Sequence, residues 1–234
     1  MIYEDEYGEE AVENGDFDIA IPFRLSLKNG GEPEITVFPS LRETAVEFLK
    51  NFKTADEIFK SETIEWVRRR VAPFCFDRMF VLSDTGTEHF INYRLKSTNT
   101  SFIQNSTCRI DDLRGLENLT SYDIEAMIEF GHICFGTVID GKIVSAACTN
   151  YPFDPEDEEN EFEIGVETAE AVRGKGYALS NCAAVAKFLK ENGRDVLYEC
   201  ENSNIPSRKL IERLGGEEFA RNFCVVAERV EKTI

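Results

Sequence analysis

The sequence predicts an α/β fold, from three observations along one segment of the 234-residue chain. Residues 162–166 alternate apolar and polar side chains with the period of a β-strand. Residues 177–190 are rich in alanine and leucine and lack proline, as expected of a helix packed on a sheet. Between them lies the basic turn Arg173-Gly174-Lys175-Gly176. A strand, a tight turn and a helix in this order indicate a sheet with helices packed on it.

Composition favours a globular protein of one large or two small domains, because 42% hydrophobic and 11% aromatic residues suffice for a core. No run of about twenty apolar residues is present to span a bilayer, and the N-terminus is acidic, so we expect a cytoplasmic protein. Seven cysteines without a C-x-x-C pair and only two histidines favour reduced thiols and no metal site.

The net charge of −18 is unevenly distributed, since residues 1–160 hold 31 of the 44 acidic and 15 of the 26 basic residues. Such a field disfavours nucleic acid and anionic membranes as partners. It would attract an amine-bearing substrate, although acidity that serves only solubility is the more economical interpretation.

The first half of the chain is predicted to form an accessory α+β region. Residues 1–16 carry seven acids and no Lys or Arg, and are predicted to be a mobile tail. Residues 17–27 read as a strand, and residues 39–52 as a helix with Ser40 as a plausible N-cap. Residues 54–71 form a second predicted helix, with Pro73 beyond its end. A hairpin is expected from residues 78–83 and 89–95 around the turn at 84–87.

The polar stretch 96–107 marks the predicted boundary, with the accessory region at 17–104 and the core at 105–234. A strand from Cys108 leads to a helical stretch at 113–130, restarted near Ser121. Residues 133–139 and 142–149 form a hairpin around Asp140-Gly141. The acidic loop 152–160 is either a solvated connector or a cation-attracting rim near the acceptor.

The turn before residue 177 is suited to an anion. Gly174 and Gly176 leave backbone N–H groups uncovered at the helix start, where the helix dipole favours negative charge, and Arg173 and Lys175 add two cations. The segment contains neither G-x-x-x-x-G-K-[ST] nor G-x-G-x-x-G. The turn therefore predicts a phosphate or pyrophosphate site of another kind.

The pattern Arg173-x-x-Gly176-x-Ala178, followed by Asn204-x-x-Ser207, Leu210 and Leu214-Gly215, resembles the GNAT-type N-acetyltransferases. Cys134-Phe135-Gly136, Asp140-Gly141 and Val144-Ser145 make the run 122–226 most similar to the branch that includes the zwittermicin A resistance N-acetyltransferase. The resemblance implies a mixed, mostly antiparallel central sheet with helices on both faces, and acetyl-CoA as co-substrate. The cofactor-binding residues it implies are Val166, Thr168, Arg173, Gly174, Lys175, Gly176, Tyr177, Ala178, Asn204 and Ser207.

Acetyl transfer to an amine needs a base and an oxyanion donor, because an alkylamine with a pKa near about 10.4 is mostly protonated at neutral pH. Gly165 suggests a bulge or a close backbone approach, and the resemblance implies a bulge here that turns the Val166 N–H toward the thioester carbonyl. Glu163 and Glu167 lie on the same strand face as Gly165 and are the candidate bases. Alternatively, both are the solvent side of the strand, or Glu167 supports the loop.

The sequence departs from the family where the resemblance places a general-acid tyrosine, four residues after Ser207, since this position is Ile211. A thiol with a pKa near about 8.5 leaves as thiolate with little help. Tyr198 and Cys200 are substitutes by position, and Cys200 is also a conceivable nucleophile, although a buried cysteine is more often a core residue.

These observations predict an acetyl-CoA-dependent N-acetyltransferase that acts on the amine of a small molecule, and they assign no oligomeric state. The rival prediction is a non-catalytic acyl-CoA sensor, which the isoleucine at position 211 motivates.

Overall fold

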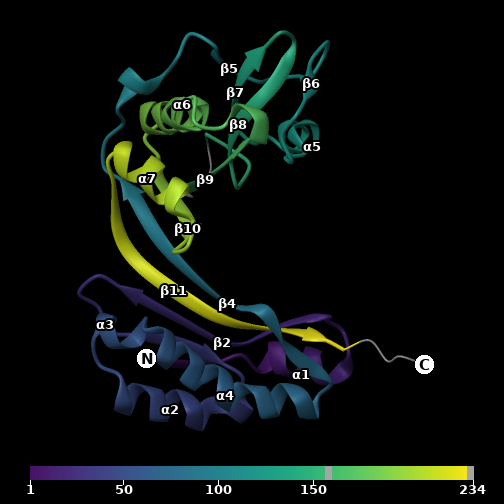
Figure 1. The fold of residues 1–234 in the computed structure, drawn as a ribbon, viewed down its shortest axis with the longest axis vertical. Coiled ribbons are helices and arrows are strands. Elements are labelled where there is room, and N and C mark those ends of the chain that lie inside the picture. Colours follow the sequence, from purple (N-terminus) through teal and green to yellow (C-terminus); the bar gives the residue numbers. More distant parts are fainter. Residues whose placement is uncertain (156–159, 231–234) are drawn as a thin grey trace. The chain divides into compact units, whose positions relative to one another are not determined.

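The computed structural model describes residues 1–155 and 160–230, except for the side chains of residues 84–88. The chain forms two compact units (Figure 1): unit 1 contains residues 1–91 and the segment from Ala220 onward, and unit 2 contains Asn92–Phe219. Each unit is described by itself below.

Unit 1 begins with short strands and continues with helices. Its elements are β1 (Ile2–Glu4), α1 (Glu6–Asn14), β2 (Ile19–Lys28), β3 (Glu34–Val37), the 3-10 turn η1 (Pro39–Leu41), α2 (Arg42–Asn51), α3 (Ala55–Ile58) and α4 (Ser61–Asp77). Parts of β4 (Phe80–Leu95) and β11 (Gly216–Arg229) complete it, with strand order β1-β3-β2-β11-β4. The β1–β3 pair is parallel, whereas β2 pairs antiparallel with both β3 and β11.

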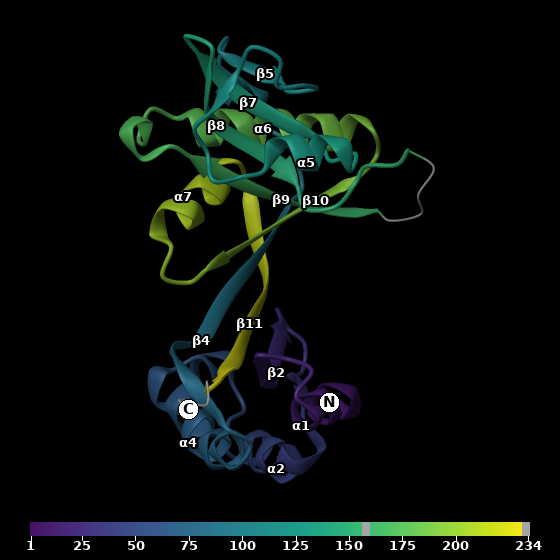
Figure 2. The same cartoon turned by 90° about the vertical axis from the view of Figure 1, so that its right-hand side faces the viewer.

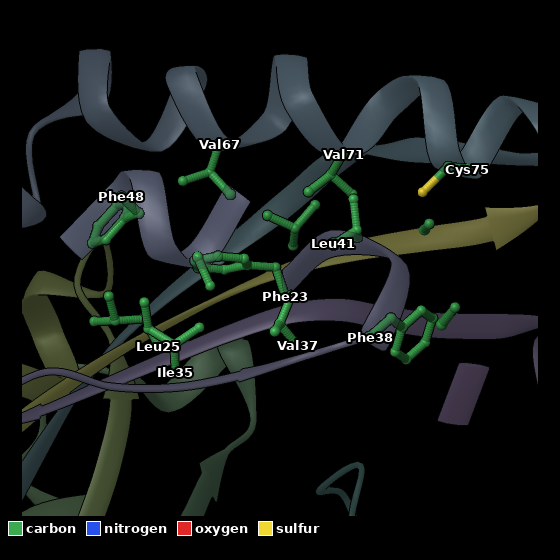
Figure 3. Close-up of a cluster of buried hydrophobic side chains, with 14 of the residues drawn as sticks. Phe23, Leu25, Ile35, Val37, Phe38, Leu41, Phe48, Val67, Val71 and Cys75 are labelled. Carbon is green, nitrogen blue, oxygen red and sulfur yellow. The ribbon is translucent and has the colours of Figure 1, made fainter. Parts of the chain in front are cut away.

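The core of unit 1 lies between this sheet and the helices α2 and α4. Phe23 and Leu25 of β2 alternate with the exposed Arg24, so one face of the strand is apolar. Figure 3 shows that their side chains point toward Phe48 of α2 and Val67 of α4. The Phe23 ring stacks on Phe223 of β11 at a centroid distance of 5.8 Å.

The predicted mobile tail at residues 1–16 is wrong, because this segment forms β1 and α1. Asp5 caps α1 by accepting a hydrogen bond from the Gly8 N–H, and Ala11 and Val12 are buried. Glu9 is also buried, where it accepts a hydrogen bond from the Ser40 N–H and pairs with Arg78. Two partners from distant parts of the chain satisfy this carboxylate, which charge composition alone does not show.

The helices of unit 1 differ in detail from those predicted. Ser40 lies inside η1 and binds Glu9 instead of capping α2. The second predicted helix is two, since α3 ends at Ile58 and α4 runs from Ser61 through Pro73 to Asp77. Val71 and Cys75 continue the buried face on either side of Pro73, and this burial favours continuing the helix despite the proline.

The predicted hairpin at residues 78–95 is replaced by the single long strand β4. A glycine between polar residues is compatible with an extended backbone as well as with a turn. The pairing partner of β4 comes from elsewhere, because β11 lies next to it in the sheet of unit 1.

Unit 2 contains the central segment of the chain. Its elements are η2 (Thr100–Phe102), β5 (Thr107–Arg109), β6 (Glu117–Asn118), α5 (Ile124–Glu129), β7 (Cys134–Ile139), β8 (Lys142–Thr149), β9 (Glu161–Thr168), η3 (Glu170–Val172), α6 (Tyr177–Glu191), β10 (Asp195–Glu201) and α7 (Ile205–Arg213). The strand order is β4-β10-β9-β8-β7-β5, and β6 pairs with β8. The β5–β7, β7–β8 and β8–β9 pairs are antiparallel, and β9–β10 is parallel.

Helices cover both faces of the sheet of unit 2, with α6 on one side and α5 on the other (Figures 1 and 2). Ser145 of β8 points to α6, where it accepts a hydrogen bond from Asn181. Its strand neighbour Ala146 points the other way, into a cluster with Ile124 of α5. The predicted α/β fold with a mixed, mostly antiparallel sheet and helices on both faces is confirmed.

The strand–turn–helix prediction is confirmed by β9 and α6, and Gly193 follows α6 in the left-handed conformation. The hairpin at Asp140-Gly141 is also confirmed, with φ values of 50° and 74°. The helix predicted at 113–130 is wrong in extent, since only Ile124–Glu129 is helical and β6 precedes it.

The two units do not coincide with the predicted division at residues 104 and 105. The chain divides between Ile91 and Asn92, and the segment from Ala220 onward joins unit 1. The reason is strand pairing, because residues 220–228 of β11 pair with β2. A pairing between the two ends of a chain leaves no local mark in the sequence. Glu156, Asp157, Glu158 and Glu159 of the predicted acidic loop lie outside the described residues.

Candidate active site

The turn between β9 and α6 exposes backbone donors. Gly174 and Gly176 have φ values of 80° and 82°, which residues other than glycine rarely adopt. Gly176 is the N-cap of α6 and supplies no side-chain acceptor. The N–H groups of the first turn, from Tyr177 onward, are therefore free of a side-chain cap, and the helix dipole makes this end favourable for an anion.

Arg173 is held against the end of β9. Its Nε donates to the Thr168 carbonyl oxygen at 3.1 Å, and its Nη2 lies 3.4 Å from a carboxylate oxygen of Glu167. The guanidinium is largely exposed, so it remains available to a ligand in the adjoining cleft. This contact supports the interpretation of Glu167 as a residue that orders the loop.

Hydrogen bonds from Gln104 hold the start of α6 in place. The Gln104 side-chain amide donates to the Lys175 carbonyl oxygen at 3.2 Å, and the Gln104 N–H donates to Ser180 Oγ at 2.7 Å. A Cβ on Gly176 would lie 3.1 Å from Gln104 Nε2. The segment before β5, which the sequence suggested only as a boundary, therefore supports the turn.

The second motif forms the opposite wall. Asn204 caps α7 by accepting a hydrogen bond from the Ser207 N–H at 3.1 Å, and Pro206 occupies the first turn, where a missing N–H costs nothing. Together the two motifs enclose a cleft of about 470 Å³. Its lining is Val166, Glu167, Thr168, Val172, Arg173, Gly174, Gly176, Tyr177, Ala178, Leu179, Asn204, Pro206, Ser207, Lys209, Leu210 and Arg213.

The cleft thus brings together nine of the ten residues predicted to bind the cofactor. Lys175 is the exception, since it is exposed and is not part of this lining in the described structure. Its carbonyl oxygen instead receives the Gln104 amide. Lys209 and Arg213 of α7 add positive charge that the sequence motifs did not indicate.

The parallel strands β9 and β10 pair only at their beginnings, from Glu161–Asp195 to Glu163–Leu197, although both continue further. The Asn150 N–H donates to the Glu163 carbonyl oxygen, and the Ala169 N–H donates to that of Val144. Hydrogen bonding toward β8 therefore uses the odd-numbered residues of β9. By this alternation the Val166 N–H points to the side of β10, where pairing has stopped, and Val166 lines the cleft.

Gly165 marks a close approach and not a bulge. The pairing of β8 with β9 runs without a shift from Ser145–Thr168 to Thr149–Ile164, so the expected bulge is wrong. A Cβ at Gly165 would lie 2.6 Å from Tyr122 Oη and 3.2 Å from Asn150 Oδ1. Any larger residue would displace the tyrosine hydroxyl, which explains a lone glycine in a regular strand.

Glu163 lies beside this position on the face that α5 covers. Burial raises the pKa of the Glu163 carboxyl, and the nearby Glu199 carboxylate raises it further. Hydrogen bonds from Asn150 and from the Glu199 backbone act in the opposite direction. Glu163 also lines a groove of about 570 Å³ with Tyr151, Pro152, Asp154, Glu161, Phe162 and Leu197. A half-buried carboxyl with a raised pKa at a groove is suited to accept a proton near neutral pH.

Tyr198 and Cys200 lie on the other face of the sheet and are buried. The β9–β10 register puts them on the same side as Phe162 and Ile164. Burial raises the pKa of the Tyr198 hydroxyl well above its usual value and that of the Cys200 thiol to about 11. Neither residue belongs to the lining of the two cavities in the described structure. A neutral, buried thiol is typical of a core cysteine.

Sequence reasoning missed Tyr122, Asn150 and Gln104. Each lies in a loop or at a helix start with no recognisable motif, and each reaches the site only through the pairing of distant strands. Arg213 was missed as well, although its spacing of three residues from Leu210 could have indicated it, since both lie on one helix face.

Within residues 1–155 and 160–230, no helix has the length and apolar character needed to cross a membrane. The same residues contain no group of three or more His, Cys, Asp or Glu side chains arranged to hold a metal ion.

Comparison with protein families matches residues 115–217 to the acetyltransferase (GNAT) domain. Among solved structures, a GNAT-family structure from Novosphingobium aromaticivorans is similar, with a TM-score of 0.50 and 18% identity over 65% of this chain and 69% of that one. A GCN5-related N-acetyltransferase-like protein from Streptococcus suis gives 0.45 and 16% over 70% and 68%. A GNAT acetyltransferase from Colwellia psychrerythraea gives 0.44 and 15% over 88% and 81%. A search of curated proteins finds no match.

Residues 115–217 thus match an acetyltransferase domain, and this match supports acetyl transfer as the activity. More particularly, the matched domain is the GNAT domain, and the matched segment contains both motifs and the cleft between them.

Proposed function

We propose that this protein transfers the acetyl group of acetyl-CoA to the amine of a small molecule. The observation that carries the proposal is the cleft where the turn before α6 meets the start of α7, beside the separation of β9 from β10. A strand separation of this kind gives an extended ligand access to the Val166 N–H from the side of the cleft.

The cleft suits the pyrophosphate of coenzyme A. Uncapped N–H groups at the start of α6 and the cations Arg173, Lys209 and Arg213 match its negative charge. Asn204 and Ser207 line the opposite wall, near which the pantetheine would lie. A side chain at Gly176 would meet Gln104 and would also be strained by the φ of 82°, so the glycine preserves the turn that exposes these N–H groups. When bound, acetyl-CoA supplies an activated thioester carbonyl.

The protein's own groups would then perform two tasks. The Val166 N–H would donate a hydrogen bond to the carbonyl oxygen as negative charge develops on it, which stabilises the transition state. Glu163 would accept a proton from the attacking amine, because its raised pKa lies closer to neutrality than that of an exposed carboxyl. The thiolate leaves without a dedicated acid, since its pKa is only about 8.5.

The acceptor is proposed to be a small amine. The resemblance to the branch that includes the zwittermicin A resistance N-acetyltransferase supports a small-molecule acceptor, and the carboxylates of Asp154, Glu161 and Glu163 at the groove that Glu163 lines favour a cation.

The first experiment is calorimetric titration of acetyl-CoA into the native chain and Gly176→Trp. Gly193→Trp is the matched control, because Gly193 also has a positive φ but lies at the opposite end of α6. Binding should be lost in Gly176→Trp and kept in Gly193→Trp. Equal affinity in all three proteins would refute the cleft assignment.

Release of thiol in the presence of a panel of amines then tests catalysis. The rival function is an acyl-CoA sensor, favoured by the burial of Ile211, Tyr198 and Cys200. Binding without amine-dependent thiol release would establish the sensor and contradict the transferase.

A further inference from the structure

Tyr122 lies beside Gly165 of β9, which stands between the two candidate bases in the chain, and no motif identifies Tyr122. Its side chain comes from the loop before α5 and extends to β9, where the hydroxyl lies against the backbone of Gly165. A Cβ at Gly165 would be 2.6 Å from Tyr122 Oη but 3.6 Å from Cζ, so the hydroxyl itself is the closest group. Gly165 directly precedes Val166, whose N–H points to the cleft.

The backbone and the ring of Tyr122 are both held in place. The Asn118 side-chain amide donates to the Tyr122 carbonyl oxygen at 2.7 Å, and Asp123 caps α5 by accepting from the Ala126 N–H at 3.1 Å. The ring packs against the buried cluster of Ile124, Cys148 and their neighbours. A hydroxyl held in this way is pre-organised and does not depend on loop closure for its position.

The surroundings of the hydroxyl are polar on the strand side. A Cβ at Gly165 would also lie 3.2 Å from Asn150 Oδ1. Glu163 and Glu167 project from the same face of β9, on either side of Gly165. Burial, together with Cys148, Cys182, Glu167 and Glu163, raises the pKa of the Tyr122 hydroxyl. The phenol is therefore neutral at physiological pH and can donate one hydrogen bond while it accepts another.

We propose that Tyr122 is a catalytic residue that binds the attacking amine and relays its proton to Glu163. The inference rests on the proposed function and names a residue for its acceptor side. As the C–N bond forms and the C–S bond breaks, the amine nitrogen gives a proton to Tyr122 Oη, and the phenol proton passes to the Glu163 carboxylate. The thiolate leaves with the electron pair of the C–S bond, and Tyr122 ends neutral.

The role of Tyr122 differs from that of the tyrosine that the resemblance places on α7. That position is the buried Ile211, whereas Tyr122 reaches β9 from the face covered by α5. A hydroxyl on the acceptor side is placed to contact the nucleophile and not the leaving thiol. The phenol of Tyr122 would therefore help to remove the proton from the amine and would not protonate the leaving thiolate.

The test compares steady-state kinetics of Tyr122→Phe with those of the native enzyme. Tyr122→Phe should lower kcat by about 10²-fold while the KM for acetyl-CoA stays unchanged, because the substitution removes one proton-transfer group and leaves the cleft intact. Tyr93→Phe is the matched control, since Tyr93 is another buried tyrosine of unit 2, with its hydroxyl 3.5 Å from Glu212. It should retain native kcat.

A double-mutant cycle with Gly165→Ala separates the hydroxyl from general structural effects. In the native background, the new Cβ displaces Tyr122 Oη and should reduce kcat to the level of Tyr122→Phe. In the Tyr122→Phe background, the obstructed atom is gone, and Gly165→Ala should change kcat within about twofold.

Three results would overturn the inference. Native kcat in Tyr122→Phe would exclude the relay, and so would additive losses in the double mutant, or a raised KM for acetyl-CoA with normal kcat. If the native chain transfers no acetyl group to any amine, then the proposed function fails and this inference fails with it. If the native chain is active and Tyr122→Phe has the same kcat, then the proposed function stands without the relay.

Discussion

The side chain of Ile211 packs directly against the backbone of Gly216. Ile211 is fully buried, and a Cβ at Gly216 would lie 2.7 Å from Ile211 Cγ1 and 3.0 Å from the Ile211 carbonyl oxygen. Gly216, which has no side chain, thus makes room for the isoleucine. Position 211 serves the packing of α7 on the start of β11 in unit 2, and not the chemistry of the cleft.

Ile211→Tyr is therefore expected to lower stability without increasing activity. A larger, polar side chain in this filled position should cost about 1–3 kcal/mol of unfolding free energy. Urea unfolding of Ile211→Tyr checks this, with Ile211→Val, expected to cost about 0.5–1.5 kcal/mol, as the volume-reducing control. A faster enzyme with native stability would show that position 211 faces the cleft after all.

Asn181 should be a stability determinant of unit 2. Its side chain is fully buried on α6, accepts hydrogen bonds from Thr107 and Thr137, and donates to Ser145, each at 3.0 Å. Asn181→Ala removes the acceptor of the buried Thr137 hydroxyl, at a cost of about 1–3 kcal/mol, whereas the Thr107 and Ser145 hydroxyl groups keep partners in Ser180 and Thr168.

Thermal unfolding measures this effect, and Asn192→Ala is the control at the exposed end of the same helix. Asn192 is the C-cap, and its side chain donates only to the Phe188 carbonyl oxygen. Its replacement should cost less than that of Asn181. Equal losses would contradict the network.

Glu163→Gln is expected to remove the acid limb of the pH–rate profile. The carboxyl must be deprotonated to act as a base, so kcat/KM of the native enzyme should rise with pH through the raised pKa of Glu163. Glu163→Gln should be slower by about 10²-fold or more and lack this limb. Glu167→Gln is the matched variant, and it should retain the limb because Glu167 contacts Arg173 at the loop. A limb that persists in Glu163→Gln would assign the base elsewhere.

The same residue makes a stability prediction of defined sign. The pKa of Glu163 is raised in the folded state, so the protonated carboxyl stabilises the fold fully below the unfolded pKa, and this contribution is lost as pH rises through the folded pKa. Glu163→Gln does not lose this contribution, because glutamine does not ionise. The variant should gain stability relative to the native chain as pH increases from about 4 upward, as measured by unfolding midpoints across pH. A relative loss over this range would contradict the sign of the shift.

Phe48→Ala should be the most damaging single truncation in the core of unit 1. The ring is fully buried and contacts Phe23, Phe52, Trp66 and Phe223 at centroid distances of 5.0–6.3 Å. A Phe→Ala change in a core costs about 3–5 kcal/mol. Phe76 of α4 is 78% exposed, so Phe76→Ala is the matched control and should have little effect. Comparable losses in both variants would show that the core is not built around Phe48.

The sequence by itself determined the local features whose physics is local. Alternation in residues 162–166 predicted β9, the glycines predicted the turn before α6, and the composition of residues 177–190 predicted α6 itself. The residues that expose backbone donors to an anion are contiguous along the chain. For this reason nine of the ten residues named from the sequence lie together at one cleft.

Only the tertiary structure decided the features that depend on pairing between distant segments. The sheet of unit 1 joins the strand at Ile19–Lys28 to the end of β11, and it turns an apparent hairpin into the long strand β4. Strand pairing also brings Tyr122 and Asn150 to Gly165 and carries Tyr198 to the opposite face from Glu163. Hydrogen bonds between strands do not depend on sequence separation, so no local pattern encodes which segments meet, and the acceptor side of the site appears only once the sheet is formed.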